Sequence, residues 1–146
     1  TLDGNVRLAH FYMGLIHLKA GNFPDAAREF EQELRLNPGD FQAKYHLAFV
    51  VLAQQETQRG IKLMQDIVRE RPDFADARYE LGKALLQKGD VKGSVENLEI
   101  AARLQPDQAH VHYQLGRAYI AAGRKAEGEK QVEMSKDLKD KARAKN

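Results

Sequence analysis

The 146 residues are enough for one domain with a buried core. Hydrophobic residues make up 42% and charged residues 30%, which argues against disorder, and the lack of cysteine excludes disulfides, thiol catalysis and thiolate metal sites. The net charge of +2 disfavours nucleic-acid binding, and no apolar run approaches the roughly 18 residues of a membrane span. Because good helix formers dominate, we expect an all-α fold.

A spacing of 34 residues runs through the chain. It relates three prolines, Pro38, Pro72 and Pro106. It also relates four aromatic residues, Phe11, Tyr45, Tyr79 and Tyr113. Two further columns hold only small residues, namely Gly14, Ala48, Gly82 and Gly116, and then Ala26, Gly60, Ser94 and Gly128. Columns that share one register indicate four repeat units, 7–40, 41–74, 75–108 and 109–142.

The first predicted helix lies at the start of the first unit and is apolar on nearly all sides. Its apolar residues are Leu8, Phe11, Tyr12, Met13, Leu15, Ile16 and Leu18. A helix that is apolar all round is usually buried on more than one side. We therefore expect another surface to cover it: either further repeats precede Thr1 in a parent protein, or two copies of the chain dimerise there.

The second unit departs from its neighbours at its turn. Gln55 stands where the first and third units have Gly21 and Gly89. We expect either a longer first helix or a looser turn in this unit.

The third unit shows the repeat pattern most clearly. Residues 75–88 carry apolar residues at helical spacing, Gly89-Asp90 has turn chemistry, and 91–105 form a second helical run that ends before Pro106. Each unit is therefore predicted to be a helix, a short turn and a second helix.

Three glycines of the third unit need separate interpretations. Gly82 lies in mid-helix, where glycine costs roughly 1 kcal/mol against alanine, so we expect its missing side chain to let the paired helix approach. Gly89 is expected to take the left-handed conformation that ends a helix. The sequence indicates no comparable role for Gly93.

The last unit ends in a polar helix, predicted at 125–141. Asp140 stands at the position of the closing proline, and the helix has few apolar residues. The terminal helix of a repeat array has no downstream neighbour and needs a polar outer face. We interpret this helix as a C-terminal cap.

The 34-residue unit resembles the tetratricopeptide repeat. The third unit carries the family pattern at Tyr79, Leu81, Gly82, Leu85, Gly89, Ser94, Leu98, Ala101 and Pro106. The resemblance covers almost the whole chain and implies a right-handed α-solenoid of antiparallel helix pairs in a single domain, 1–146. It also implies a non-catalytic scaffold that binds a peptide or helix of a partner protein in a concave groove lined by the first helix of each unit.

The resemblance places groove residues at fixed positions of each first helix. They are Phe11, Leu15, Tyr45, Phe49, Tyr79, Lys83, Leu86, Tyr113 and Arg117, with Leu8 at the first such position of the chain. The resemblance thus implies an apolar N-terminal half and a weakly basic C-terminal half, suited to a segment with an apolar face and some acidic character. One subclass clamps the C-terminal carboxylate of chaperones with lysine and asparagine, and this chain lacks that pair.

Motifs for catalysis and metal binding are weak. Gly82-Lys83 lacks the spacing and the preceding strand of a phosphate-binding loop. His110 and His112 point about 200° apart around a helix, so they do not chelate one ion. We interpret the histidines as surface or half-buried residues.

Acidic pairs such as Glu31 and Glu33 are interpreted as parts of solvated helix faces. We predict no enzyme, no cofactor and no metal site.

Other functions stay possible alternatives to the scaffold. One is a self-association module that acts through the apolar N-terminal helix, and another is a regulatory segment of a larger protein. A nucleic-acid binder of the related 35-residue class is disfavoured by the period of 34 and the few groove cations. We predict a protein or peptide partner and no nucleic acid. The repeats look bacterial in style, and a cytoplasmic location is favoured over a periplasmic or exported one.

Overall fold

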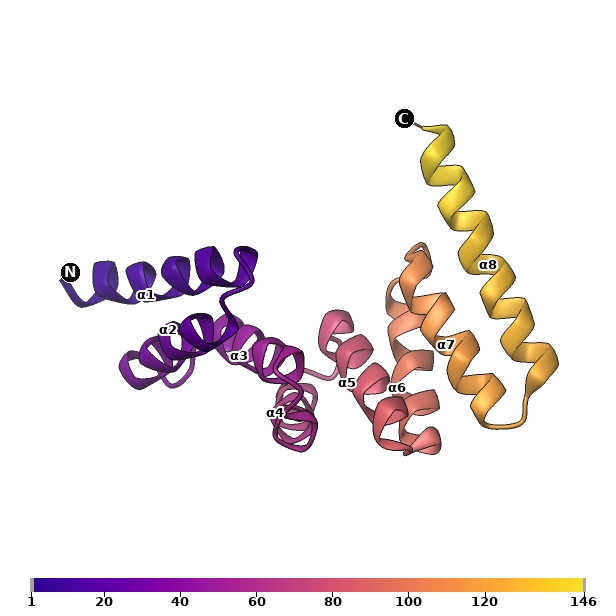
Figure 1. Cartoon of the computed structure of the whole chain (residues 1–146), viewed down its shortest axis with the longest axis horizontal. Coiled ribbons are helices and arrows are strands. Elements are labelled where there is room, and N and C mark those ends of the chain that lie inside the picture. The colour runs from indigo at the N-terminus through magenta and orange to yellow at the C-terminus, as the bar shows by residue number, and fades with distance from the viewer. Residues whose placement is uncertain (1, 146) are drawn as a thin grey trace. The chain divides into compact units, whose positions relative to one another are not determined.

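In a computed structural model of the chain, residues 2–145 are described, and their side chains from residue 9 onward. This part of the chain contains eight α-helices and no strand (Figure 1). The helices are α1 (Leu2–Lys19), α2 (Phe23–Leu36), α3 (Phe41–Ala53), α4 (Thr57–Glu70), α5 (Ala75–Lys88), α6 (Val91–Leu104), α7 (Ala109–Ala121) and α8 (Lys125–Ala144). The predicted all-α fold is confirmed.

The chain divides into two compact units. Unit 1 is Thr1–Glu70 and contains α1 to α4, and unit 2 is Arg71–Asn146 and contains α5 to α8. Within each unit, every helix packs against the next one along the chain. The successive pairs of helices match the predicted helix–turn–helix pattern of the sequence.

The two columns of small residues face each other inside the helix pairs. A Cβ atom added to Gly82 on α5 would lie 2.6 Å from Cγ of Leu98 on α6. The hydroxyl of the fully buried Ser94 donates to the Gly82 carbonyl oxygen at 2.7 Å. In the last pair, a Cβ on Gly116 would lie 2.8 Å from the carbonyl oxygen of Gly128. The small side chains therefore set how closely the paired helices approach, as predicted for Gly82.

The turns between paired helices use the left-handed backbone conformation. Gly21, Gly89 and Gly123 have φ values of 78°, 94° and 81°. Gln55 takes the same conformation, with φ of 68°, at a cost of roughly 1–2 kcal/mol for a residue with a Cβ. The prediction of a longer first helix is wrong, because α3 ends at Ala53 after only 13 residues.

Gly93 has a role that the sequence did not indicate. Asp90 is the N-cap of α6, and its side chain accepts a hydrogen bond from the Gly93 backbone N–H at 3.0 Å. A Cβ on Gly93 would lie 2.7 Å from Oδ2 of Asp90. The glycine therefore leaves room for the capping carboxylate.

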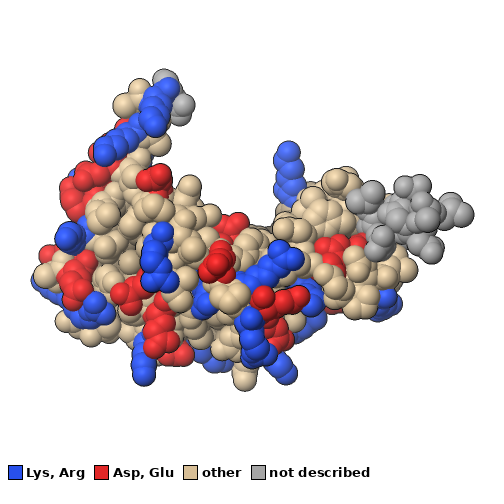
Figure 2. Space-filling view, turned by 180° about the vertical axis from the view of Figure 1, so that it is seen from behind, with Lys and Arg blue, Asp and Glu red and all other residues tan. Residues whose placement is uncertain are grey.

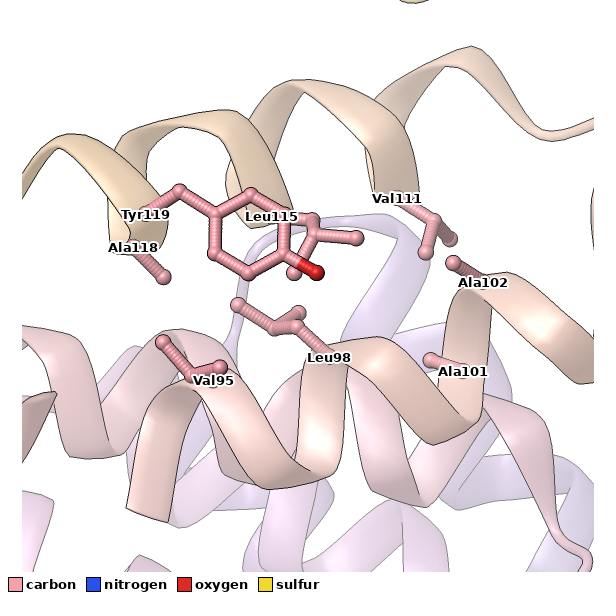
Figure 3. Packing of buried hydrophobic residues seen from close by; sticks show 8 residues of the cluster. All are labelled: Val95, Leu98, Ala101, Ala102, Val111, Leu115, Ala118 and Tyr119. Carbon is pink, nitrogen blue, oxygen red and sulfur yellow. The ribbon is translucent and has the colours of Figure 1, made fainter. Parts of the chain in front are cut away.

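A buried hydrophobic cluster joins α6 to α7 in unit 2. Figure 3 shows its members, Val95, Leu98, Ala101, Ala102, Val111, Leu115, Ala118 and Tyr119. Leu98 projects from α6 toward Leu115 and Tyr119 on α7, and its side chain is fully buried. Burial of one such leucine contributes about 1.5–3 kcal/mol to folding. The phenol of Tyr119 donates to Glu99 Oε2 at 2.9 Å, so its polar end stays satisfied at the edge of the cluster.

The described side chains of α1, from residue 9 onward, are buried mainly on one side of the helix. Phe11, Leu15 and Leu18 pack against the core cluster of unit 1, which includes Phe30 of α2. Tyr12 and Ile16 are 57% and 60% exposed. The expectation that a second surface covers this helix therefore stays a prediction.

Helix α8 is longer than the predicted 125–141 and extends to Ala144. Only Gly128 and Ser135 of this helix are buried, and charged residues dominate its exposed side. The capping role of this helix stays a prediction.

Substitution of Gly82 tests the close approach of α5 and α6. We expect Gly82→Leu to lower the free energy of unfolding by about 3 kcal/mol or more, because the added atoms would overlap Leu98 and its backbone. The measurement is urea unfolding followed by circular dichroism. The neighbouring exchange Lys83→Ala is the control and should change stability by less than about 0.5 kcal/mol. Equal stability of the two variants would contradict this account of the helix contact.

Candidate functional site

The first helices of unit 2, α5 and α7, bring two predicted site residues, Tyr79 and Lys83, together with His110. The rings of Tyr79 and His110 meet edge to face, with centroids 4.8 Å apart. Lys83 lies one turn after Tyr79, and its Nζ atom is 5.6 Å from the centre of that ring. A cation over an aromatic face is an attractive arrangement. Sequence reasoning had placed Tyr79 and Lys83 here and had not assigned His110 a contact.

The same face continues along α7. Tyr113 is 44% exposed, and Arg117 is exposed one turn further, where its Nη1 atom lies 3.4 Å from Oε1 of Gln114. Lys139 of α8 places its Nζ atom 5.8 Å from the centre of the Tyr113 ring. Lys139 was missed because the predicted site residues came only from first helices. We call Tyr79, Lys83, His110, Tyr113, Arg117 and Lys139 the aromatic–basic face.

Leu86 is half-buried and packs against the hydrophobic cluster between α6 and α7. Tyr79 is also half-buried and packs against the same cluster, so only part of its side chain is open to a partner. Both residues therefore contribute to the core of unit 2.

Burial shapes the electrostatics beside the aromatic–basic face. Glu80 is 8% exposed, and burial raises the pKa of its carboxyl, although Lys83 at 3.8 Å opposes this and Asp76 adds to it. The pKa of the Tyr79 phenol is also raised, first by burial and then by Glu80, while a hydrogen bond with Gln114 lowers it. The phenol therefore stays neutral at physiological pH and serves as a hydrogen-bonding group rather than as a base.

In unit 1 the predicted site residues are more apolar and more deeply packed. Phe11 meets Phe30 and His46 with ring centroids 6.0 and 5.6 Å apart. Leu15 packs against the core cluster, while Tyr45 and Phe49 are half-buried. Some of the predicted groove residues of unit 1 thus contribute mainly to packing. Leu8 lies outside the residues whose side chains are described.

Two polar residues are more buried than the sequence suggested. His112, expected at the surface or half-buried, is 4% exposed. Its ring stays satisfied, because Nε2 donates to the Pro106 carbonyl at 2.7 Å and Nδ1 lies 2.7 Å from Oε1 of Gln131. Glu33, expected on a solvated face, is 2% exposed within unit 1.

A search of the described residues finds no cluster of histidine and acidic side chains that could hold a metal ion. None of their helices combines the length and apolar character needed to cross a bilayer. On the face shown in Figure 2, positive and negative side chains alternate without a large area of one sign. Such a face does not resemble the concentrated basic footprint of a nucleic-acid binder.

Comparisons with known families identify the fold. One tetratricopeptide repeat model matches residues 13–73 and 50–96, and a second matches 82–123. The chain belongs to the tetratricopeptide repeat family. Membership in this family supports a general role in protein–protein interaction, and such repeats are typically non-catalytic.

Solved structures agree on the architecture. A structure titled MamA 41-end from Desulfovibrio magneticus RS-1 has a TM-score of 0.84 and 21% identity, over 92% of this chain and 76% of that one. Another MamA crystal structure has a TM-score of 0.84 and 22% identity, over 96% of this chain and 81% of that one. Likeness at this identity concerns the fold, and it confirms the predicted solenoid of helix pairs. A comparison with curated proteins gives no match.

The buried carboxyl of Glu80 gives a pH prediction. Since its pKa in the folded state is raised above 4.5, the folded state binds more protons than the unfolded state at pH values between 4.5 and the raised pKa. Stability should therefore fall as pH rises through this window. Glu80→Gln should remove that part of the slope in urea unfolding measured at several pH values. The exposed Glu96→Gln should keep the slope, and an unchanged slope in Glu80→Gln would refute the assignment.

Proposed function

We propose that the chain is a non-catalytic scaffold that binds a peptide or helix of a partner protein along its first helices. The observation that carries this proposal is the aromatic–basic face of α5 and α7. Two tyrosines offer rigid, amphipathic contact area, and aromatic residues and arginine are enriched among the residues that dominate binding energy.

The charges on this face favour an acidic segment. Arg117 contacts the neutral amide of Gln114, and among the described residues no carboxylate lies within ion-pair distance of Arg117 or Lys139. Lys83 already has a carboxylate partner, since its Nζ atom lies 3.8 Å from Oε2 of Glu80. Arg117 and Lys139 are thus the two cations of this face that are available to acidic side chains of a partner.

The first helices of unit 1 support a complementary, apolar contribution. Tyr45 and Phe49 of α3 are half-buried, and Phe49 stands at the position that Lys83 occupies on α5, 34 residues later. An extended or helical partner with apolar and acidic residues fits both kinds of surface. The kind of partner is inferred from the side chains of these surfaces, without assuming a particular protein.

A double substitution tests the aromatic–basic face. A partner is captured by affinity pull-down, identified by mass spectrometry and titrated against the purified chain by calorimetry. We expect Tyr79→Ala with Arg117→Ala to weaken binding at least tenfold, about 1.4 kcal/mol, while circular dichroism shows unchanged helicity. Added salt should weaken binding to the native chain further.

The matched control is Arg103→Ala, an exposed arginine on α6 and outside this face. It should leave the affinity unchanged. Equal affinity of the double variant and the native chain would place the interface elsewhere, for example on the convex face.

A second candidate function, self-association, rests on the uncovered side of α1. Tyr12, Met13 and Ile16 are 57%, 42% and 60% exposed. They lie within four residues of each other on one helix, and contiguous apolar surface of this kind commonly marks an interaction site.

Charged substitutions on α1 test self-association. If two copies meet through this surface, sedimentation velocity of the native chain should show a dimer that Tyr12→Glu with Ile16→Glu converts to a monomer. Leu104→Glu, at a 36% exposed leucine on α6, is the control and should preserve the dimer. A native chain that sediments as a monomer at all concentrations would eliminate this function.

A further inference from the structure

A recurring polar contact ties the first helix of a repeat to its surroundings. Arg78 on α5 donates from Nε to the Pro72 carbonyl oxygen at 2.9 Å and from Nη1 to Oδ1 of Asn97 on α6 at 2.9 Å. The guanidinium therefore joins three segments, namely the closing turn before α5, α5 itself and α6. We call this arrangement the polar latch.

The latch repeats with the period of the sequence. Thirty-four residues after Arg78, His112 makes the equivalent contacts with Pro106 and Gln131, each at 2.7 Å. Sixty-eight residues before Arg78, His10 lies 2.6 Å from Oε2 of Glu29. In all three pairs, the two side chains are 19 residues apart in the chain.

The second repeat lacks the latch. Lys44 occupies the first position of the pair, but Leu63 stands at the second, where the other repeats have glutamate, asparagine or glutamine. Without a polar partner on α4 at that position, the Lys44 ammonium lies instead 3.3 Å from Oε2 of Glu70. Both positions of the missing pair, Lys44 and Leu63, lie instead in the wall of a cavity.

A cavity of about 280 Å³ occupies this place in unit 1. Its lining consists of Leu34, Pro38, Lys44, Leu47, Leu63 and Asp66. None of these residues is among the predicted groove positions, so the cavity is separate from the first-helix face. It lies below the roughly 300–1,000 Å³ of pockets for drug-sized ligands, so it suits a single side chain.

The lining determines what kind of side chain fits. Three leucines and a proline ring supply apolar contacts, and both charged residues already have partners, since Lys44 contacts Glu70 and Asp66 lies 3.1 Å from Arg69. A guanidinium or imidazole in this cavity would lack the polar partner that the other repeats have, because Leu63 stands at that position. It would also meet the positive charge of Lys44. An uncharged aliphatic group needs neither an acceptor nor a counter-ion.

We propose that this cavity is a second binding site, which takes one uncharged aliphatic side chain of leucine size from a partner peptide. The site is independent of the aromatic–basic face, and its occupation does not require that face to bind. It acts as an anchor pocket, in which a single buried side chain supplies most of the local binding energy.

The test uses N-acetyl-leucine methylamide as the probe and leucine methyl signals of the full chain in nuclear magnetic resonance as the readout. We expect saturable shifts of the Leu34 and Leu47 methyls with a dissociation constant on the order of 1–10 mM, and unshifted Leu98 and Leu115 methyls in unit 2. N-acetyl-arginine methylamide and N-acetyl-glycine methylamide should leave the Leu34 and Leu47 methyls in place. No saturable shift with the leucine probe, or equal shifts with the arginine probe, would overturn the proposal.

Restoring the latch should close the site. Lys44→Arg with Leu63→Asn recreates the pair found at Arg78 and Asn97, and we expect at least tenfold weaker binding of the leucine probe. Leu34→Phe fills the cavity without a new polar group and should have the same effect, which keeps the test decisive if the double variant does not fold. Lys62→Arg, an exposed exchange on α4, should bind like the native chain. A folded latch variant that keeps the native affinity would refute the proposal.

Discussion

The close approach of the two helices in each pair is the constraint on which the rest of this structure depends. A single repeat has too little surface to bury a core alone, so its helices must pack tightly and stack on the next pair. The facing small residues Gly82 and Ser94 make this approach possible, and the Ser94 hydroxyl satisfies a backbone carbonyl at the contact. With the backbones this close, Leu98 reaches across to the following helix and joins one pair to the next.

The proposed binding surface depends on the same helix packing. Each first helix turns its small residue toward its partner helix. Tyr79, Lys83, Tyr113 and Arg117 lie beside that contact and not within it, so they stay partly or fully exposed. This surface borders the core. Glu80, one residue from Tyr79, is buried, and burial raises the pKa of its carboxyl. A residue proposed for binding and a buried residue are therefore neighbours in the sequence of one helix. A substitution at one of them is expected to affect the other.

The sequence predicted those features that depend on local pattern. The period located every helix pair, and glycine chemistry predicted the left-handed turn at Gly89 and the close contact at Gly82. Glutamine does not itself favour positive φ, so only the register with Gly21 and Gly89 pointed to the left-handed turn at Gln55. The burial of His112 could not be predicted, because it depends on polar partners at Pro106 and Gln131. Lys139 was missed for a related reason, since only the packing of α8 on α7 brings it to Tyr113.

The missing latch of the second repeat also has a consequence for cooperativity. In a linear repeat array, each unit is held by its own stability and by its interfaces with its neighbours. Arg78 and His112 strengthen such junctions by binding the closing turn that precedes their helices, whereas Lys44 makes no such bond with Pro38 in the described structure. The junction between the first and second repeats therefore lacks a polar contact that Arg78 and His112 make in the later repeats. We therefore expect the closing turn before α3 to open more readily than the turns before α5 and α7, which are held by side chains.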